Sequence, residues 1–388
     1  MLNNMKKEIK NKIACERGMK VFVGISGGVD SSVTSALLKE QDYDVTGVFI
    51  KVWQPDFVEC QWKQDRLDAM RVCASLDIPF LDLDLEKEYK QGVFDYMIDE
   101  YKRGRTPNPD VMCNKKIKFG GFLKFALENG ADYIATGHYV RLNNRLDTGC
   151  PSCNSLGHPV SKWELLAGVD KEKDQSYFLW TLTQEQLKHC LFPIGEFQKS
   201  KVRKLAKKFD LVNAQKKDSQ GLCFVGKVDM KEFLERFLPH KQGNVLNIDG
   251  EKIGEHDGVH YYTLGQRHGF RITEKGIEDE AYYIVSKDLE KNTLTVSIKK
   301  DGVLKIKENF DRKKIAIGDI NWISGEEPDL NKKYQARIRY RQELQNCVLE
   351  KEDNQFFVNF EKEQKTATSG QSIVVYDGDI CLGGGVIK

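Results

Sequence analysis

The chain has almost no net charge and no long apolar run. Its 388 residues carry 60 Lys and Arg against 58 Asp and Glu, a formal charge of +2. Overall charge therefore does not indicate a nucleic-acid partner, and any such surface must come from a local patch. No segment approaches the ~20 consecutive apolar residues of a membrane-spanning helix. Residues 1–19 are charged and lack the apolar core of a secretory signal, so we expect an N-terminal extension on a cytoplasmic protein with no membrane partner.

Ten cysteines are scattered along the chain rather than concentrated in a small segment. Without an export signal, this pattern favours a reducing compartment, where most cysteines pack as small apolar residues and a few do chemistry. Cys150 and Cys153 form C-P-S-C with His158 nearby. This group predicts a plain surface loop, a redox pair or a zinc site with only three candidate ligands in view, and the sequence leaves these alternatives open.

Strand and helix patterns alternate in the first part of the chain. Strands are predicted at 21–26, 44–53, 78–85 and 131–139, and helices at 31–41, 66–77, 119–130 and 198–211. This alternation is typical of an α/β fold with a parallel, doubly wound sheet. Residues 142–170 are rich in turn-forming residues and are predicted to be a loop insertion. After about residue 243 the apolar period becomes two, which predicts a small antiparallel barrel or sandwich.

The length suits two or three domains. We predict a catalytic domain at 20–226, a small central domain at 227–300 and a C-terminal antiparallel β-barrel at 301–388. We expect the protein to act as a monomer.

The strongest chemical signal is GISGGVDSS at residues 24–32, between a predicted strand and a predicted helix. Gly27 and Gly28 leave no side chain between the backbone amides and an anion, and the helix N-terminus adds a favourable dipole, so the loop predicts a phosphate site. It lacks the Gly-Lys-Ser/Thr of the common ATP loop and the glycine spacing of the dinucleotide fingerprint. S-G-G-x-D-S instead resembles the pyrophosphate loop of enzymes that adenylylate a carbonyl oxygen and release pyrophosphate. A glycine-rich turn without a ligand is the alternative.

Two further segments each end near a cysteine. RTPNPDVMC (105–113) has two prolines and predicts an ordered, non-helical loop that places Cys113 just before a basic helix start, where a thiolate is favoured. DSQGLCF (218–224) places Cys223 in a second turn-like stretch after two lysines. Nothing local joins these segments, and two buried structural cysteines are the alternative.

Eight motifs taken together resemble the tRNA-specific 2-thiouridylase family, in that family's order and over nearly the whole chain from residue 20. They are the loop at 24–32, RTPNPDVMC (105–113), ATGHY (135–139), KDQSYFLW (173–180), FPIGEFQKSKVR (192–203), DSQGLCF (218–224), GVHYYTLGQRHG (258–269) and GQSIVVYDGDICLGGGVI (370–387). So long an ordered match is far more specific than a likeness of fold.

The resemblance implies a reaction on tRNA that uses ATP and Mg²⁺. ATP would adenylylate O2 of a wobble uridine in Lys, Glu and Gln acceptors, which makes AMP the leaving group. Cys223 would carry sulfur as a persulfide, and Cys113 would be the nucleophile that releases it, leaving a disulfide for a reductant to reopen. Direct attack of Cys113 on the base stays open. A persulfide donor, either a cysteine desulfurase or a sulfur-relay protein, is the further partner implied.

The resemblance also assigns binding residues. Nucleotide contacts fall on Gly24, Ile25, Ser26, Gly27, Gly28, Val29, Asp30, Ser31, Ile50 and Gly137, with Asp30 helping to hold Mg²⁺ and phosphate. Asn108, Pro109 and Asp110 would contact the target base. Other tRNA contacts map onto His138, Lys173, Asp174, Gln175, Arg339, Tyr340 and Gln371. A lone histidine is more often structural, but the place of His138 at the end of a predicted strand favours function.

One segment, 199–217, contains eight basic residues and a single acid, Asp210. Such a patch suits a phosphate backbone, although a solvated helix face is the alternative. Two other functions compete with tRNA thiolation. One is a different adenylylating enzyme of this fold, an amidotransferase-type synthetase or a tRNA lysidine synthetase, which needs no cysteine pair. The other is a non-catalytic nucleotide-binding or tRNA-binding module.

Overall fold

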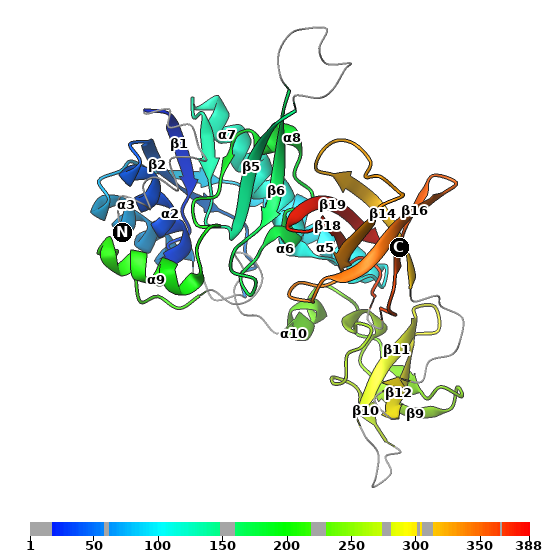
Figure 1. Cartoon of the computed structure of the whole chain (residues 1–388). Coiled ribbons are helices and arrows are strands. Elements are labelled where there is room, and N and C mark those ends of the chain that lie inside the picture. The colour runs from blue at the N-terminus through cyan, green and yellow to red at the C-terminus, as the bar shows by residue number, and fades with distance from the viewer. Residues whose placement is uncertain are drawn as a thin grey trace.

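The structure is a computed structural model that describes residues 18–57, 62–147, 160–218, 230–273, 281–300, 303–304, 313–364 and 367–388. An α/β part, a β-barrel and a smaller β-domain are visible in Figure 1. Within the described ranges, no helix combines the length and the apolar character needed to cross a membrane.

The first part is built on a five-stranded parallel sheet with the strand order β3-β2-β1-β4-β7. Its strands are β1 (Lys20–Gly24), β2 (Asp44–Lys51), β3 (Phe80–Asp84), β4 (Tyr133–Ala135) and β7 (Cys190–Leu191). The central strand β1 carries apolar side chains on both of its faces, and Val21, Phe22 and Val23 are all buried. A strand buried on both faces needs this continuous apolar run, which is the signal that predicted it.

Helices cover both faces of this sheet, which confirms the predicted doubly wound α/β fold. One face carries α2 (Val29–Glu40), α3 (Trp62–Ser75) and α9 (Lys199–Lys208). Val33, Val72 and Val202 from these helices pack in one apolar cluster with Ile25. The other face carries α4 (Glu86–Tyr89), η1 (Lys90–Asp95), α5 (Tyr96–Lys102), α6 (Pro109–Cys113), η2 (Asn114–Gly121) and α7 (Phe122–Glu128).

The strand order reverses between β1 and β4. The chain moves outward from β1 to β2 and β3, and then returns to place β4 on the other side of β1. In parallel sheets of this type, the carboxyl ends of the two strands at the reversal open a crevice in which ligands bind. The glycine-rich loop follows β1, and Gly137 follows β4.

The C-terminal part is a closed six-stranded antiparallel barrel. Its strands are β14 (Lys314–Trp322), β15 (Lys333–Arg337), β16 (Gln345–Glu352), β17 (Gln355–Phe360), β18 (Ser372–Asp377) and β19 (Ile380–Ile387). The order β14-β17-β16-β15-β18-β19 closes because β14 also pairs with β19. The predicted C-terminal barrel is therefore confirmed.

The predicted loop insertion at 142–170 is wrong at 142–147 and 160–167, which are strands, and residues 148–159 lie outside the described ranges. The chain instead forms a hairpin of β5 (Val140–Asp147) and β6 (Val160–Ala167), and β6 pairs with β19 of the barrel at Leu165 and Leu166. In the segment VSKWELLA, polar and apolar residues alternate and Leu165 is completely buried. The sequence prediction missed this short period-two pattern because turn-forming residues dominate the stretch before it. The hairpin extends the barrel sheet toward the α/β part (Figure 1).

The smaller β-domain lies below the barrel in Figure 1. It contains α10 (Met230–Glu235), β8 (Gly243–Leu246), β9 (Lys252–His256), η5 (Val259–Tyr261), β10 (Arg271–Ile272), β11 (Tyr282–Asp288), β12 (Thr293–Lys300) and β13 (Val303–Leu304). Two short elements, η4 (Ser176–Phe178) and α8 (Gln184–Leu187), connect β6 to β7 in the α/β part.

A buried ionic network fastens the α/β part to the barrel. Arg337 of β15 donates to the Asp174 carboxylate at 2.6 Å and to the Tyr376 hydroxyl at 2.7 Å. Asp174 also accepts the backbone N–H groups of Gly168 and Ser176. Arg337 and Asp174 side chains are only 7% and 4% exposed. Each charge is out of water, so each depends on the other for compensation.

We predict that Arg337→Met destabilises the protein by about 3–5 kcal/mol, because the Asp174 charge stays buried after its cation is removed. The measurement is thermal unfolding of the full chain, read as a fall in Tm. Lys351→Met is the matched control. It removes a surface pair to Glu327 at 2.7 Å whose side chains are 31% and 51% exposed, and it should cost no more than about 1 kcal/mol. Equal Tm values for the two variants would contradict this assignment.

Candidate active site

The glycine-rich loop makes a turn that only glycine can occupy at residue 27. Gly27 has a φ of +69°, and a Cβ there would lie 2.4 Å from the carbonyl oxygen of Asp65. Both the left-handed backbone and the close approach of α3 exclude a side chain. The loop can therefore turn sharply from β1 into α2.

The N-terminus of α2 carries no side-chain cap. Gly28 is the N-cap residue and offers no side chain, and the hydroxyls of Ser32 and Thr34 donate to the carbonyls of Gly28 and Asp30. The first N–H groups of a helix have no partner within the helix, and they lie at the positive end of its dipole. This end of α2 is thus suited to an anion.

Gly137 lies directly against the loop. A Cβ at this position would come within 2.8 Å of the backbone nitrogen of Ser31 and 2.9 Å of the backbone carbon of Asp30. The end of β4 therefore meets the first turn of α2, as the reversal of the strand order predicts. Ile50 lies in the adjacent strand β2 and is buried.

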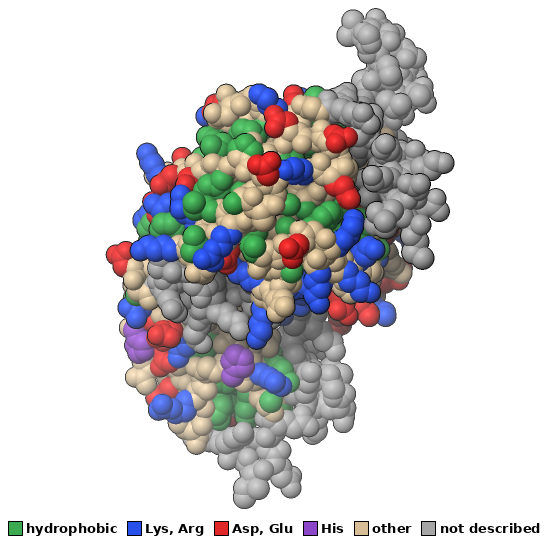
Figure 2. All heavy atoms as spheres, turned by 90° about the vertical axis from the view of Figure 1, so that its left-hand side faces the viewer, with side chains coloured by type: hydrophobic (Ala, Val, Ile, Leu, Met, Phe, Trp, Pro, Cys, Tyr) green, Lys and Arg blue, Asp and Glu red, His purple; other side chains and the backbone are tan. Residues whose placement is uncertain are grey.

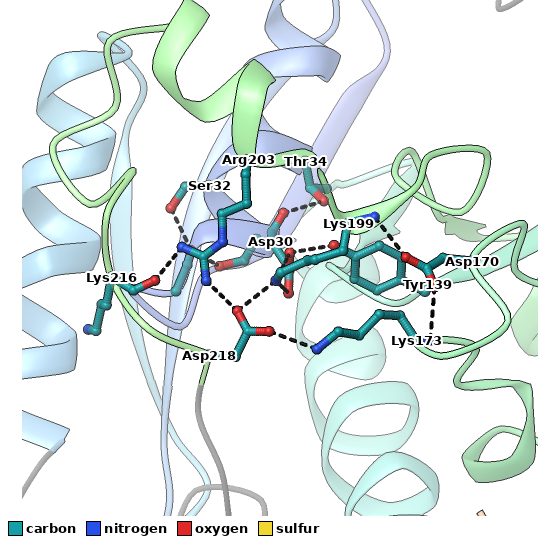
Figure 3. Close-up of polar contacts among 12 residues, drawn as sticks. Asp30, Ser32, Thr34, Tyr139, Asp170, Lys173, Lys199, Arg203, Lys216 and Asp218 are labelled. Carbon is teal, nitrogen blue, oxygen red and sulfur yellow. Dashed lines mark hydrogen bonds and ion pairs between the residues drawn. The ribbon is translucent and has the colours of Figure 1, made fainter. Parts of the chain in front are cut away.

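Two residues distant in sequence converge on the Asp30 side chain (Figure 3). Lys199, the first residue of α9, places Nζ 2.8 Å from both carboxylate oxygens, and the Tyr139 hydroxyl donates to Oδ1 at 2.7 Å. Burial and the negative charge of Asp30 raise the pKa of Tyr139 well above its ordinary value. Tyr139 consequently stays a hydrogen-bond donor at physiological pH.

The Asp218 carboxylate forms ion pairs with three cationic side chains near the loop (Figure 3). Lys199 and Arg203 reach Oδ1 at 2.9 and 2.5 Å, and Lys173 reaches Oδ2 at 2.8 Å. Burial raises the pKa of the Asp218 carboxyl, but hydrogen bonds from Lys173 and Lys199 outweigh it and hold the pKa well below its usual range. Asp218 is therefore a carboxylate at every physiological pH.

The described carboxylates do not form a ready metal site. No group of three or more His, Cys, Asp or Glu in the described ranges has the arrangement of a metal centre. Both oxygens of Asp30, the residue expected to help hold Mg²⁺, already accept Lys199. The donor set as it stands thus does not fit a metal ion held by protein ligands alone.

The segment before Cys223 is tied to the loop. Asn213 donates to the carbonyl of Gly27 at 2.8 Å and to the Ser32 hydroxyl at 2.9 Å. Lys216 bridges Asp65 and Asp68 of α3 at 2.8 and 2.7 Å. Burial lowers the pKa of Lys216, but those two carboxylates outweigh it and raise the pKa above its ordinary value.

The expected non-helical loop at 105–113 is wrong in its second half. Asn108 is an N-cap whose side chain accepts the Val111 N–H at 3.3 Å, Pro109 occupies the first helical turn, and α6 runs through Cys113 into η2. Pro is favoured at this position because it has no N–H to satisfy. Cys113 therefore lies within a continuous helical segment and not just before a helix start, and its side chain is 0% exposed.

Several residues singled out in the sequence fall outside the described ranges. They are Cys223, Cys150, Cys153 and His158. The pairing of Cys113 with Cys223 and the nature of the C-P-S-C group stay predictions.

The Asn108–Asp110 segment is held by the barrel. Gln371 donates to the carbonyls of Thr106 and Pro107 at 2.9 and 3.0 Å. The N–H of Thr106 bonds to the carbonyl of Ser369 at 2.8 Å. The three residues expected to contact the target base are partly exposed, so this rigid support presents them at the surface.

The predicted tRNA contacts Lys173, Asp174 and Gln175 have internal partners. Lys173 pairs with Asp218, Asp174 with Arg337, and the Gln175 side chain accepts the N–H of Tyr139 at 3.0 Å. Arg339 is exposed, and the Tyr340 ring lies 4.6 Å from that of Phe178. Of these five residues Arg339 is exposed, Lys173, Gln175 and Tyr340 are partly exposed, and Asp174 is buried in its ion pair with Arg337.

His138 is buried next to Phe119, with its Nδ1 2.7 Å from the Thr136 hydroxyl. Burial, assisted by the charge of Lys118, lowers the pKa of His138 well below its ordinary value. The imidazole is neutral in the folded protein. Its predicted contact with tRNA stays a prediction.

The basic residues of segment 199–217 differ in their surroundings. Lys199, Arg203 and Lys216 are engaged in the ion pairs above, and Lys208 pairs with Glu40 at 3.3 Å. Lys201 is partly exposed, and Lys204, Lys207 and Lys217 are exposed. Figure 2 shows the face that includes this region, where lysine and arginine side chains gather across the middle with acidic side chains among them. The exposed lysines are the ones that a phosphate backbone could reach.

Several residues of the site were missed in the sequence. Tyr139, Asn213 and Asp218 were given no role of their own, and Lys199, Arg203 and Lys216 were counted only as parts of a basic patch. Tyr139 had a usable signal, because it follows β4 at the strand reversal. The others come from segments about 170 residues or more beyond the loop, with no local pattern linking them to it.

The fold and the loop define a class: a doubly wound α/β protein with a glycine-rich loop and an uncapped helix start at the strand reversal. Three family matches extend this class. Residues 19–227 match the family described as tRNA methyl transferase HUP domain, 231–298 the tRNA methyl transferase PRC-barrel domain and 312–387 the aminomethyltransferase beta-barrel domain.

Full-length relatives carry a different name. The tRNA-specific 2-thiouridylase MnmA of Francisella tularensis subsp. novicida is 46% identical over 95% of this chain and 99% of its own length. That of Francisella philomiragia subsp. philomiragia is 45% identical over the same shares. Among solved structures, the U34-tRNA thiolase NcsA from Methanococcus maripaludis gives a TM-score of 0.36 at 19% identity, covering 61% of this chain and 74% of that one. The chain belongs to the tRNA-specific 2-thiouridylase family.

We predict that the neutral His138 makes folding stability fall in mild acid. The unfolded chain takes up a proton near pH 6.5 and the folded chain does not, so stability decreases as pH falls below about 6.5, by up to about 1.4 kcal/mol per pH unit. His138→Gln should flatten the dependence of Tm on pH between about 6.5 and 5. His240→Gln, which replaces an exposed histidine, should keep the wild-type slope. An unchanged slope in the His138 variant would mean that this imidazole is protonated in the folded state.

Proposed function

We propose that this protein is an ATP-dependent tRNA 2-thiouridylase that replaces O2 of the wobble uridine with sulfur. The observation that carries the proposal is the anion site between the ends of β1 and β4, in a chain that is 46% identical over 95% of its length to a protein named tRNA-specific 2-thiouridylase. No separate observation favours another adenylylating enzyme of this fold.

ATP would bind with its phosphates at the N-terminus of α2. The loop from Gly24 to Ser31 supplies amides, and Gly137 permits close approach. Ile50 would contribute its backbone. Mg²⁺ would arrive with the nucleotide, since magnesium is commonly held by one or two carboxylates together with substrate phosphates. Asp30 would serve as such a ligand only after Lys199 releases one of its oxygens.

Adenylylation makes the later substitution possible. The uridine O2 attacks the α-phosphorus, pyrophosphate leaves, and the base oxygen becomes part of an AMP leaving group. Asn108, Pro109 and Asp110 would hold the base, which must be unstacked to reach the site. His138, Lys173, Asp174, Gln175, Arg339, Tyr340 and Gln371 would contact or support the rest of the tRNA.

Sulfur would come from a persulfide on Cys223, loaded by a cysteine desulfurase or a sulfur-relay protein. The Cys113 thiolate attacks the Cys223 sulfur, and the terminal sulfur leaves as hydrosulfide. Hydrosulfide adds to C2, and AMP departs with the former O2. The Cys113–Cys223 disulfide that remains needs two electrons from a thiol reductant, so a reducing cytoplasm is the expected compartment.

The burial of Cys113 adds a requirement. Its side chain is 0% exposed, so the segment around α6 must open, or its contacts must change, before Cys113 meets the persulfide. Binding of the tRNA substrate would cause this opening. The substrates would be the tRNAs for Lys, Glu and Gln, and the protein would act as a monomer.

We predict that Cys113→Ser and Cys223→Ser each lower the formation of 2-thiouridine by more than about 10³-fold, because each removes a sulfur that the transfer requires. The measurement is mass spectrometry of nucleosides from unmodified tRNA incubated with ATP, Mg²⁺, a cysteine desulfurase, cysteine and a thiol reductant.

Cys190→Ser is the matched control. Cys190 is equally buried and donates to the Gln186 carbonyl at 3.1 Å, a bond that a serine hydroxyl preserves, so thiolation should stay within about twofold of wild type. Wild-type protein that makes no 2-thiouridine under these conditions would refute the function. Full activity in either of the first two variants would refute only the assigned role of that cysteine.

A further inference from the structure

Three cationic side chains surround Asp218, as they would surround a bound anion. Here the Asp218 carboxylate takes the place of that anion. Lys173, Lys199 and Arg203 all reach this one carboxylate within 2.9 Å. The nearby Asp170 is engaged elsewhere, because its oxygens accept the backbone N–H groups of Lys199, Glu172 and Lys173. Three cations therefore face the two carboxylates of Asp218 and Asp30.

This cluster is adjacent to the phosphate loop. Lys199 contacts Asp218 and Asp30 with the same Nζ, and Asp30 belongs to the first turn of α2. A phosphate chain that begins at the α2 amides and extends past Asp30 would therefore reach Lys199 first and Arg203 next. Figure 3 shows Lys199 between the two carboxylates, with Arg203 on the other side of Asp218.

The cluster is also open to a ligand. The side chains of Lys199, Arg203 and Asp218 are 14%, 29% and 31% exposed. These partly exposed charges can be reached from solvent, as a binding site requires. Lysine and arginine together suit a polyphosphate, because arginine offers a planar fork and lysine a point charge.

We propose that Lys199 and Arg203 bind the β- and γ-phosphates of ATP, and that Asp218 holds both cations in place until the nucleotide displaces it. This inference rests on the proposed function and specifies which residues distinguish ATP from AMP. Lys199 and Arg203 together form the clamp. Before ATP binds, Asp218 keeps these two side chains ordered and balances their charge, and it competes with the polyphosphate for them.

The test is calorimetric measurement of the Kd for ATP and for AMP with the full chain at low ionic strength. Asp218→Asn should tighten ATP binding about threefold, because a competing anion is removed. Arg203→Met should weaken ATP binding about tenfold, because charge-assisted hydrogen bonds to phosphate are lost. Neither variant should change the Kd for AMP by more than about twofold, since AMP lacks the β- and γ-phosphates.

Lys204→Met is the matched control, since Lys204 is an exposed lysine on the same helix, and it should leave both affinities unchanged. Weaker ATP binding by Asp218→Asn, or equal losses for ATP and AMP in Arg203→Met, would overturn the clamp and leave a structural ion pair. If Arg203→Met does not fold, the opposite sign expected for Asp218→Asn decides the matter alone. Wild-type protein that binds neither nucleotide would instead refute the proposed function.

Discussion

The reversal of strand order between β1 and β4 is the constraint from which the rest of the site follows. Parallel strands bring their carboxyl ends to one edge, and at a reversal the helices leave in opposite directions, so the edge stays uncovered. Here that edge places the uncapped start of α2 against Gly137, where a single added methyl group would strike backbone. Every charged group of the site, from Asp30 to Asp218, is arranged around this uncovered edge.

The spacing of apolar residues predicted those strands and helices whose pattern of buried residues lies within one continuous segment. The run around Val21–Val23 predicts a strand enclosed on both faces, and the α2 segment after the loop predicts its helix. The glycine-rich loop predicts phosphate binding from the sequence alone, because the residues that this chemistry needs are consecutive. Where a rule of composition stood alone it failed: two prolines at 105–113 suggested a non-helical loop, although Pro109 after Asn108 is a favourable helix start.

The remaining features could not be predicted because their partners are far apart in the chain. Lys199 meets Asp30 across 169 residues, and Asn213 meets Gly27 across 186. A side chain alone does not indicate which distant carboxylate it will face, so Lys199 and Arg203 were indistinguishable from the exposed lysines beside them. The family resemblance gave positions for binding but could not show that Asp174 points inward to Arg337.

The pairing of β6 with β19 has a consequence for how this protein can be divided. Family boundaries place β6 in the first region and β19 in the last, yet the two strands share one continuous hydrogen-bonded sheet. A shortened chain that ended before the barrel would expose the edge of β6 as a template for strands of other molecules. Such a fragment would be prone to aggregate, and the two regions are better regarded as one cooperative folding unit than as exchangeable modules.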